Sequence, residues 1–225
     1  MTADRVKFKA ILFDLDGTLL DTLRDIADSA NFALGRLGLA THSIQDYKYF
    51  VGDGIETAIR RILPESRRDE GTVARCLELN RAEYHRCWPV HTKPYSGIVD
   101  MLTELQNRDI PMAILSNKPH EFVREMVARL LDGFKFRVVR GAKPGVPVKP
   151  DPTAAVQIAG QLKIPPAGFV YLGDSDTDMQ TANAAGMYAV GALWGFRTAD
   201  ELIQAGAKRL VEEPGEVVGL FDDDC

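Results

Sequence analysis

The feature that most limits the possible folds is a set of short apolar runs, each of which ends abruptly in polar residues. The runs are Ala10–Phe13, Met112–Leu115 and Phe169–Leu172. A short, unbroken apolar run that stops at Asp, Ser or Gly is typical of a strand buried on both faces. Strands of this kind belong to parallel sheets covered by helices, so we predict a parallel sheet that contains these strands.

Strand and helix alternate along the second half of the chain. The spacing of apolar residues predicts helices over 98–107, 121–131, 152–162, 179–185 and 201–205. Further strands are expected over 136–139 and 188–193. This alternation favours an α/β fold with a doubly wound, Rossmann-like parallel sheet.

The segment between the first two apolar runs shows helical patterns instead. Apolar residues recur at helical spacing over 21–39, 55–63 and 73–88, and no convincing strand is expected between Leu20 and Pro89. We therefore expect an α/β core made of residues 1–19 and 91–225, with an all-helical insert made of residues 20–90. Ligands of open α/β sheets bind outside the carboxyl ends of the strands, and an insert at this point would lie over that edge.

The charge and the cysteines argue against several classes of protein. The net charge of −5 does not suit a nucleic-acid partner, which requires a basic face. Cys76, Cys87 and Cys225 form no C-x-x-C pair, so a redox motif or zinc knuckle is not expected, and their odd number suits a reducing compartment. The polar start of the chain predicts neither a signal peptide nor a membrane span. We expect a cytoplasmic protein with no membrane or nucleic-acid partner; the sequence does not indicate an oligomeric state.

Polar side chains follow each of the three apolar runs, and one lysine opens a turn before a predicted helix. They are Asp14 and Asp16, Ser116 and Asn117, Asp174 and Asp178, and Lys149. Because the carboxyl ends of parallel strands meet at one edge of a sheet, we expect these residues to converge in one crevice.

The residue types in this crevice suit phosphoryl transfer. Asp14, Asp16 and Asp174 would repel one another unless a cation or a proton divides their roles, and a hard cation such as Mg²⁺ prefers oxygen ligands. Lys149 and the hydroxyl of Ser116 can hold phosphoryl oxygens. A nucleophile, a cation and neutralising donors are the combination that phosphoryl transfer needs.

The same residues carry a resemblance to the haloacid dehalogenase-like superfamily. Asp14–Leu19 reads D-L-D-G-T-L and resembles its first motif, Ser116-Asn117 its second, Lys149–Pro152 its third, and Gly173–Asp178 its fourth. The order and spacing agree over nearly the whole chain. The chain is most similar to the phosphoglycolate phosphatase-like branch, in which a helical cap follows the first motif.

The resemblance implies a role for each matched residue in the reaction. Asp14 would attack phosphorus and become an aspartyl phosphate, and Asp16 would serve as the general acid and base. Ser116, Asn117 and Lys149 would bind the transferring phosphoryl group. An acid/base at Asp16 also separates the chain from the dehalogenases of the superfamily.

The resemblance also implies a metal site. Mg²⁺ would be held by Asp14, Asp174 and the backbone carbonyl of Asp16. Asp178 would support the site from outside the ligand shell, and Thr18 would orient Asp16.

The expected activity is hydrolysis of a small phosphorylated metabolite, with 2-phosphoglycolate as the leading substrate. A phosphosugar mutase similar to β-phosphoglucomutase would share these motifs, as would a pyrophosphate or nucleotide phosphatase. A non-enzymatic phosphoaspartate signalling module is an alternative of another class, although such a module is typically about half this length.

Two features of the predicted cap have open interpretations. Gly52-Asp53-Gly54 could be a loop that points into the crevice, or an ordinary turn. Arg60 and Arg61 could meet a substrate carboxylate, but a solvated helix face is the favoured interpretation.

Overall fold

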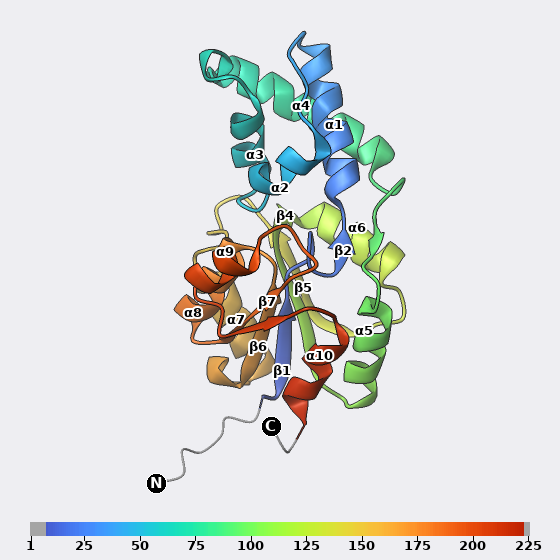
Figure 1. The fold of residues 1–225 in the computed structure, drawn as a ribbon, viewed down its shortest axis with the longest axis vertical. Coiled ribbons are helices and arrows are strands. Elements are labelled where there is room, and N and C mark those ends of the chain that lie inside the picture. The colour runs from blue at the N-terminus through green and yellow to red at the C-terminus, as the bar shows by residue number, and fades with distance from the viewer. Residues whose placement is uncertain (1–7, 223–225) are drawn as a thin grey trace.

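The computed structural model describes residues 8–222. A six-stranded, all-parallel sheet forms the centre of the larger unit (Figure 1). The strand order is β5-β4-β1-β6-β7-β8. The strands are β1 (Ala10–Phe13), β4 (Met112–Pro119), β5 (Phe136–Ala142), β6 (Phe169–Gly173), β7 (Tyr188–Ala192) and β8 (Arg209–Val211). The predicted α/β fold with a doubly wound parallel sheet is confirmed.

The position of β1 explains its composition. It lies between β4 and β6, with Leu12 paired to Ala113 on one side and to Tyr171 on the other. All four residues of β1 are fully buried. An unbroken apolar run is the pattern that a strand covered on both faces requires.

Helices cover both faces of this sheet (Figure 1). One face packs against α5 (Ile98–Asn107), α6 (His120–Leu130) and α10 (Gly215–Val218). The other packs against α7 (Thr153–Leu162), α8 (Asp176–Ala185) and α9 (Ala199–Gln204). The two layers hold separate apolar clusters, as expected for a doubly wound fold.

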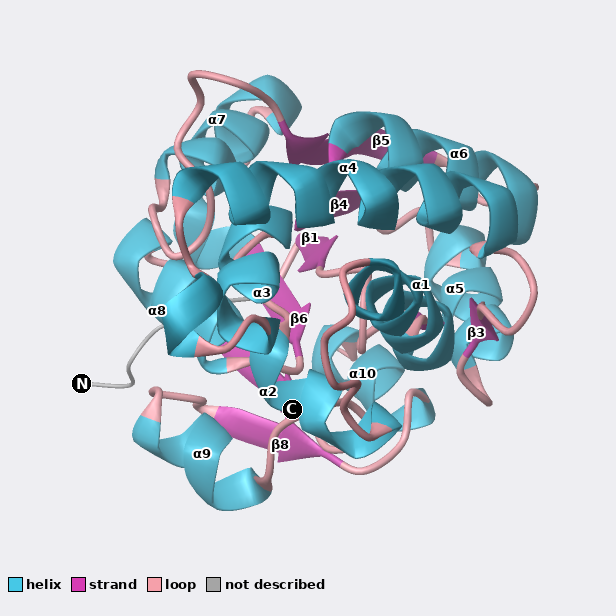
Figure 2. Cartoon of the chain, turned by 90° about the horizontal axis from the view of Figure 1, so that it is seen from above, coloured by secondary structure: helices cyan, strands magenta, loops and turns pink. Residues whose placement is uncertain are grey.

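A second, helical unit lies above the carboxyl ends of the strands (Figures 1 and 2). We call it the helical cap: α1 (Leu23–Arg36), α2 (Tyr47–Phe50), α3 (Ile55–Ile62) and α4 (Glu70–Cys87). These helices share an apolar cluster of their own. Two short antiparallel strands, β2 (Leu20–Asp21) and β3 (Lys93–Pro94), join the cap to the sheet unit.

Several element bounds differ from the expectations; β5, for example, runs to Ala142 and α8 begins at Asp176. Strand β4 continues to Pro119 instead of ending at Leu115, because its last residues still pair with β5. Strand β2 begins at Leu20, and β8 and α10 were not expected; all three elements have at most four residues, too few for a periodic pattern.

The expected solvated tail at 222–224 lies largely outside the described residues. Asp222 is described, and its exposed carboxylate pairs with Arg108. Within residues 8–222, no helix has the length and apolar character needed to span a bilayer.

Candidate active site

The predicted polar residues meet at the carboxyl edge of the sheet. Asp14 directly follows β1, Ser116 lies in β4, and Asp174 directly follows β6. Because these three strands are adjacent in the sheet, residues more than a hundred positions apart in the sequence reach one place.

Lys149 lies between two buried carboxylates. Its Nζ atom is 2.8 Å from Asp14 Oδ1 and 2.7 Å from Asp178 Oδ1. The lysine is 3% exposed, so water hardly solvates its charge, and the two carboxylates must stabilise that charge instead. The turn before α7 therefore delivers a positive charge directly beside Asp14.

The pKa values of this group reflect an excess of negative charge. Burial, and then the charges of Asp178 and Asp174, raise the pKa of Asp14 well above its ordinary value, although Lys149 opposes the shift. Burial alone would lower the pKa of Lys149, but Asp14 and Asp178 hold it well above the ordinary value. One lysine thus faces three buried carboxylates, and a further cation would relieve the imbalance.

Asp178 is fixed by several partners at the start of α8. Ser175 Oγ donates a 2.6 Å hydrogen bond to Asp178 Oδ2, and its backbone N–H donates to the same oxygen. The Tyr171 hydroxyl and Lys149 occupy Oδ1. Ser175 and Asp178 form a capping box, which explains the local sequence at this helix start.

Asp174 sits in a tight cradle built from backbone. A Cβ atom on Gly17 or on Gly195 would come within 2.3 Å of the Asp174 side chain, so both positions require glycine. Thr18 Oγ1 donates to Asp174 Oδ1 at 2.8 Å, and the N–H of Phe196 donates to Oδ2 at 2.9 Å. The expectation that Thr18 orients Asp16 is therefore wrong, because the Thr18 hydroxyl donates its hydrogen bond to Asp174 instead.

The carboxylates of this site suit a divalent cation. Oxygens of Asp14, Asp174 and Asp178 lie within 4.8 Å of one another. Asp14 Oδ1 is buried without a hydrogen-bond donor in correct geometry, although it forms the ion pair with Lys149. Burial, and then Asp178, raise the pKa of Asp174 to about 7. An all-oxygen donor set with surplus negative charge fits Mg²⁺.

Asp16 is not part of this carboxylate group. Its Oδ1 atom instead accepts a 2.8 Å hydrogen bond from Lys118 Nζ. The metal contact expected of Asp16 uses its backbone carbonyl, so the ion pair of its side chain with Lys118 does not conflict with that expectation. The side chains of Asp14 and Asp16 therefore face different cations, Lys149 and Lys118.

Ser116 and Asn117 of β4 differ in whether their side chains have hydrogen-bonding groups left for a ligand. Ser116 Oγ accepts from the Lys118 N–H, which leaves its own O–H free to donate. The side-chain amide of Asn117 is occupied: it bonds the backbone N–H and carbonyl of Lys149 and the carbonyl of Gly52. Any contact between Asn117 and a phosphoryl group would therefore have to use its backbone N–H.

Lys118 is a site residue for which the sequence predicted no role. Its side chain is 7% exposed, and its Nζ atom lies 4.7 Å from the centre of the Tyr84 ring, which comes from α4 of the cap. Asp16, ahead of Tyr84, raises the pKa of Lys118 against the effect of burial. The sequence signals for it were its position at the end of a buried strand, two residues after Ser116, and the run Asn117-Lys118-Pro119, which resembles the phosphoglycolate phosphatase-like branch.

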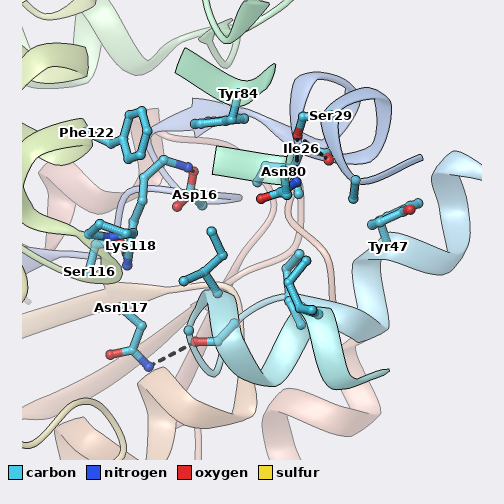
Figure 3. A pocket seen from close by; sticks show the side chains of 18 of the residues that line it. Asp16, Ile26, Ser29, Tyr47, Asn80, Tyr84, Ser116, Asn117, Lys118 and Phe122 are labelled. Carbon is cyan, nitrogen blue, oxygen red and sulfur yellow. Dashed lines mark hydrogen bonds and ion pairs between the residues drawn. The ribbon is translucent and has the colours of Figure 1, made fainter. Parts of the chain in front are cut away.

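A cavity separates these residues from the helical cap (Figure 3). Its volume is about 100 Å³, and it opens to solvent. Asp14, Asp16, Ser116 and Asp174 line its floor. Its cap side is mainly apolar and includes Ile26, Ala30, Ile55, Ala58, Ile59 and Ile62.

The glycine-flanked loop of the cap does point into this region. Gly52 and Gly54 line the cavity, both with positive φ. Asp53 accepts a hydrogen bond from Thr177 at the start of α8 and pairs with Arg61. The loop therefore contacts the sheet unit instead of forming an isolated turn.

Arg60 and Arg61 lie on the cap surface. Arg60 pairs with Glu56 and Glu70, and Arg61 pairs with Asp53. Neither arginine lines the cavity, so the favoured interpretation of a solvated helix face is confirmed.

The loop after β7 is a second connection between the two units. The Phe196 ring packs in the apolar cluster of the cap, while its N–H bonds Asp174. Arg197 donates to the carbonyls of Lys48 and Val51 at the ends of α2. The residue that holds Asp174 is thus also embedded in the cap.

Comparison with known proteins agrees with this arrangement. Residues 11–192 match the family model described as haloacid dehalogenase-like hydrolase. A phosphoglycolate phosphatase from Pseudomonas syringae pv. tomato is 30% identical over 225 residues, covering 96% of this chain and 81% of the relative. One from Aquifex aeolicus is 30% identical over 216 residues, covering 96% and 97%.

A solved structure has the same fold over almost its entire length. It comes from Lactobacillus delbrueckii subsp. bulgaricus and carries a provisional phosphoglycolate phosphatase name. It superposes with a TM-score of 0.91 at 30% identity, covering 97% of this chain and 100% of that one.

Proposed function

The chain belongs to the haloacid dehalogenase-like hydrolases and is a phosphoric monoester hydrolase, and we propose that it hydrolyses 2-phosphoglycolate through a phosphorylated Asp14. The observation that carries the proposal is the position of Asp14. Its carboxylate lies at the floor of the cavity, 2.8 Å from Lys149 and close to Asp174. A buried carboxylate with a cation beside it is suited to attack an anionic phosphoryl group.

In the first step a carboxylate oxygen of Asp14 bonds to phosphorus, and the bond between phosphorus and the glycolate oxygen breaks. Asp16 gives its proton to that oxygen, so glycolate leaves as an alcohol. Lys149 and the Ser116 hydroxyl hold the phosphoryl oxygens while charge shifts.

In the second step Asp16 takes a proton from a water molecule as its oxygen attacks phosphorus. The bond between phosphorus and Asp14 breaks, which releases inorganic phosphate and restores the Asp14 carboxylate. Asp178 and Thr18 would not contact the substrate but would position other residues: Asp178 holds Lys149, and Thr18 holds Asp174.

Mg²⁺ would be held by Asp14, Asp174 and the backbone carbonyl of Asp16, where it supplies positive charge that offsets the repulsion between the phosphoryl group and the carboxylates. The all-oxygen donor set and its surplus negative charge support this cation.

Specificity for 2-phosphoglycolate has two supports. Relatives that carry this name match nearly the whole chain at 30% identity. On its cap side the cavity is lined mainly by apolar side chains, which offer few partners for the hydroxyls of a sugar.

We further propose that residues 20–90 act as a cap domain over a catalytic core made of 1–19 and 91–225, and that the enzyme works in the cytoplasm. The unpaired thiols of Cys76 and Cys87 support a reducing compartment.

The test is phosphate release from 2-phosphoglycolate with Mg²⁺, beside sugar phosphates, nucleotides and pyrophosphate, with Asp14→Asn as the blank. We expect the highest kcat/KM for 2-phosphoglycolate and no turnover by the variant. A higher value for another substrate would replace the proposed specificity, and undiminished turnover by Asp14→Asn would refute the nucleophile.

A further inference from the structure

The size of 2-phosphoglycolate restricts where its carboxylate can bind. The carboxyl carbon is bonded to the carbon that carries the leaving oxygen, so the carboxylate oxygens lie only roughly 3 Å from that oxygen. Because the leaving oxygen must meet the proton donor Asp16, the group that recognises the carboxylate has to be a close neighbour of Asp16.

The described residues that line the cavity include a single positively charged side chain, Lys118. Its Nζ atom is 2.8 Å from Asp16 Oδ1. Arg60 and Arg61 are absent from the lining and are bound to acidic residues of the cap. Both its positive charge and its position beside Asp16 therefore make Lys118 the candidate for binding the carboxylate.

We infer that Lys118 and the hydroxyl of Tyr84 bind the carboxylate of the substrate and so determine its specificity. This inference rests on the proposed function and adds the residues that distinguish glycolate from other leaving groups.

The hydrogen-bonding state of the two side chains supports the assignment. An ammonium group has three N–H donors, and one of those of Lys118 Nζ is directed to Asp16 at 2.8 Å. The hydroxyl of Tyr84 is buried, and within the described part of the chain it forms no hydrogen bond of good geometry, although Lys118 lies near enough to oppose the rise that burial causes in its pKa. A buried hydroxyl without a partner is costly unless a ligand supplies one.

Both side chains are held firmly. Lys118 lies in β4, and its ammonium group faces the Tyr84 ring. Tyr84 packs edge-on against Phe122, with ring centres 5.1 Å apart. Figure 3 shows Lys118, Tyr84 and Asp16 together at one end of the cavity. A subsite made by β4 and by α4 of the cap would contact substrate only when the cap is closed.

The rest of the cavity favours a small acid over a polyhydroxy leaving group. Asn80 and Ser29 are buried and already hydrogen-bonded to each other at 3.2 Å. The other cap side chains that face this space are mostly apolar. Sugar hydroxyls placed there would lose water without gaining partners.

The experiment compares 2-phosphoglycolate with ethyl phosphate, in which a methyl group replaces the carboxylate. The quantity measured is the ratio of the two kcat/KM values in the wild type, Lys118→Met, Lys118→Arg and Tyr84→Phe. Arg60→Met is the matched control, because Arg60 is a cap cation outside the cavity.

We expect the ratio to fall about 30-fold in Lys118→Met, as for loss of a hydrogen bond to a charged group, and roughly fivefold in Tyr84→Phe. Lys118→Arg should keep part of the preference, and Arg60→Met should keep all of it. Tyr84→Phe preserves packing and decides the matter if Lys118→Met does not fold.

Two results overturn the inference alone. One is an unchanged ratio in Lys118→Met and Tyr84→Phe. The other is an equal loss of both activities in Lys118→Met, which would mean that Lys118 acts on Asp16 and not on the carboxylate. A wild-type enzyme without a preference for 2-phosphoglycolate would overturn the proposed substrate and this inference together.

Discussion

The side-chain amide of Asn117 donates a 3.0 Å hydrogen bond to the carbonyl oxygen of Gly52, and so joins the end of β4 to the loop of the cap. The same amide bonds both backbone groups of Lys149. One side chain therefore holds Lys149, the lysine that we propose binds phosphate, and also contacts the loop of the cap.

Replacing Asn117 with alanine should impair both functions. The change leaves buried backbone groups of Lys149 without partners, so we expect a loss of about 1–3 kcal/mol in the free energy of unfolding. We also expect kcat/KM to fall by at least tenfold, because Lys149 loses its position. Urea unfolding and steady-state kinetics check this, with the exposed Asn107→Ala as control; equal behaviour of the two variants would contradict the role.

The contact between Asp53 and Thr177 should stabilise the closed cap. Burial would raise the pKa of Asp53, but hydrogen bonds from Thr177 and Arg61 hold it below its ordinary value. A lowered pKa means that the contact is complete above about pH 4 and is lost as the pH falls further. Thr177→Val should raise KM roughly fivefold at neutral pH, whereas Thr103→Val, on the exposed face of α5, should not. An unchanged KM would show that this contact does not limit substrate binding.

Binding of Mg²⁺ should depend on pH near neutrality. Burial, and then Asp178, raise the pKa of Asp174 to about 7, and a metal ligand must be deprotonated. Without metal, the charged form of Asp174 is disfavoured in the folded state. Stability of the metal-free protein should therefore decrease as pH rises from its ordinary pKa of 3.8 toward 7.

The measurement is the shift in Tm caused by a fixed Mg²⁺ concentration at pH 6 and pH 8. We expect the larger shift at pH 8, little shift in Asp174→Asn, and loss of activity in a chelator that added Mg²⁺ restores. Equal shifts at the two pH values would count against Asp174 as a ligand.

Lys149 should be required for stability as well as for turnover. In Lys149→Met the carboxylates of Asp14, Asp174 and Asp178 lose their buried positive partner. We expect the free energy of unfolding to fall by about 3 kcal/mol at pH 8 and activity to be lost. Lys135→Met, an exposed lysine, should change stability by less than about 0.5 kcal/mol. A small effect of Lys149→Met would mean that the ion pairs with Asp14 and Asp178 are weak.

The fold and the site floor were predictable because they depend on local patterns. Apolar runs such as Ala10–Phe13 predicted buried strands, and the rule that parallel strands present one carboxyl edge brought Asp14, Ser116 and Asp174 together. The start of one helix was expected too late: apolar spacing predicted 179, whereas the capping pair Ser175 and Asp178 places the start of α8 at Asp176.

The cap side of the site was not predictable from the same patterns. Tyr84 and Phe196 are separated from the motif residues by sequence, and only tertiary packing places one above Lys118 and the other in the cap cluster. The predicted partner of Thr18, Asp16, was incorrect for a similar reason. Motif order brings Thr18 close to Asp16 in sequence, whereas the turn at Gly17 directs its hydroxyl to Asp174.

The most direct test of the central proposal is to trap the phosphorylated enzyme. Asp16→Asn, incubated with Mg²⁺ and acetyl phosphate, whose leaving group needs no proton, should form the intermediate but hydrolyse it slowly. After acid quenching, peptide mass spectrometry should find one phosphoryl group on Asp14 and none in the Asp14→Asn control. A phosphoryl group on another residue, or unmodified Asp14 in an enzyme that still turns over, would contradict the mechanism.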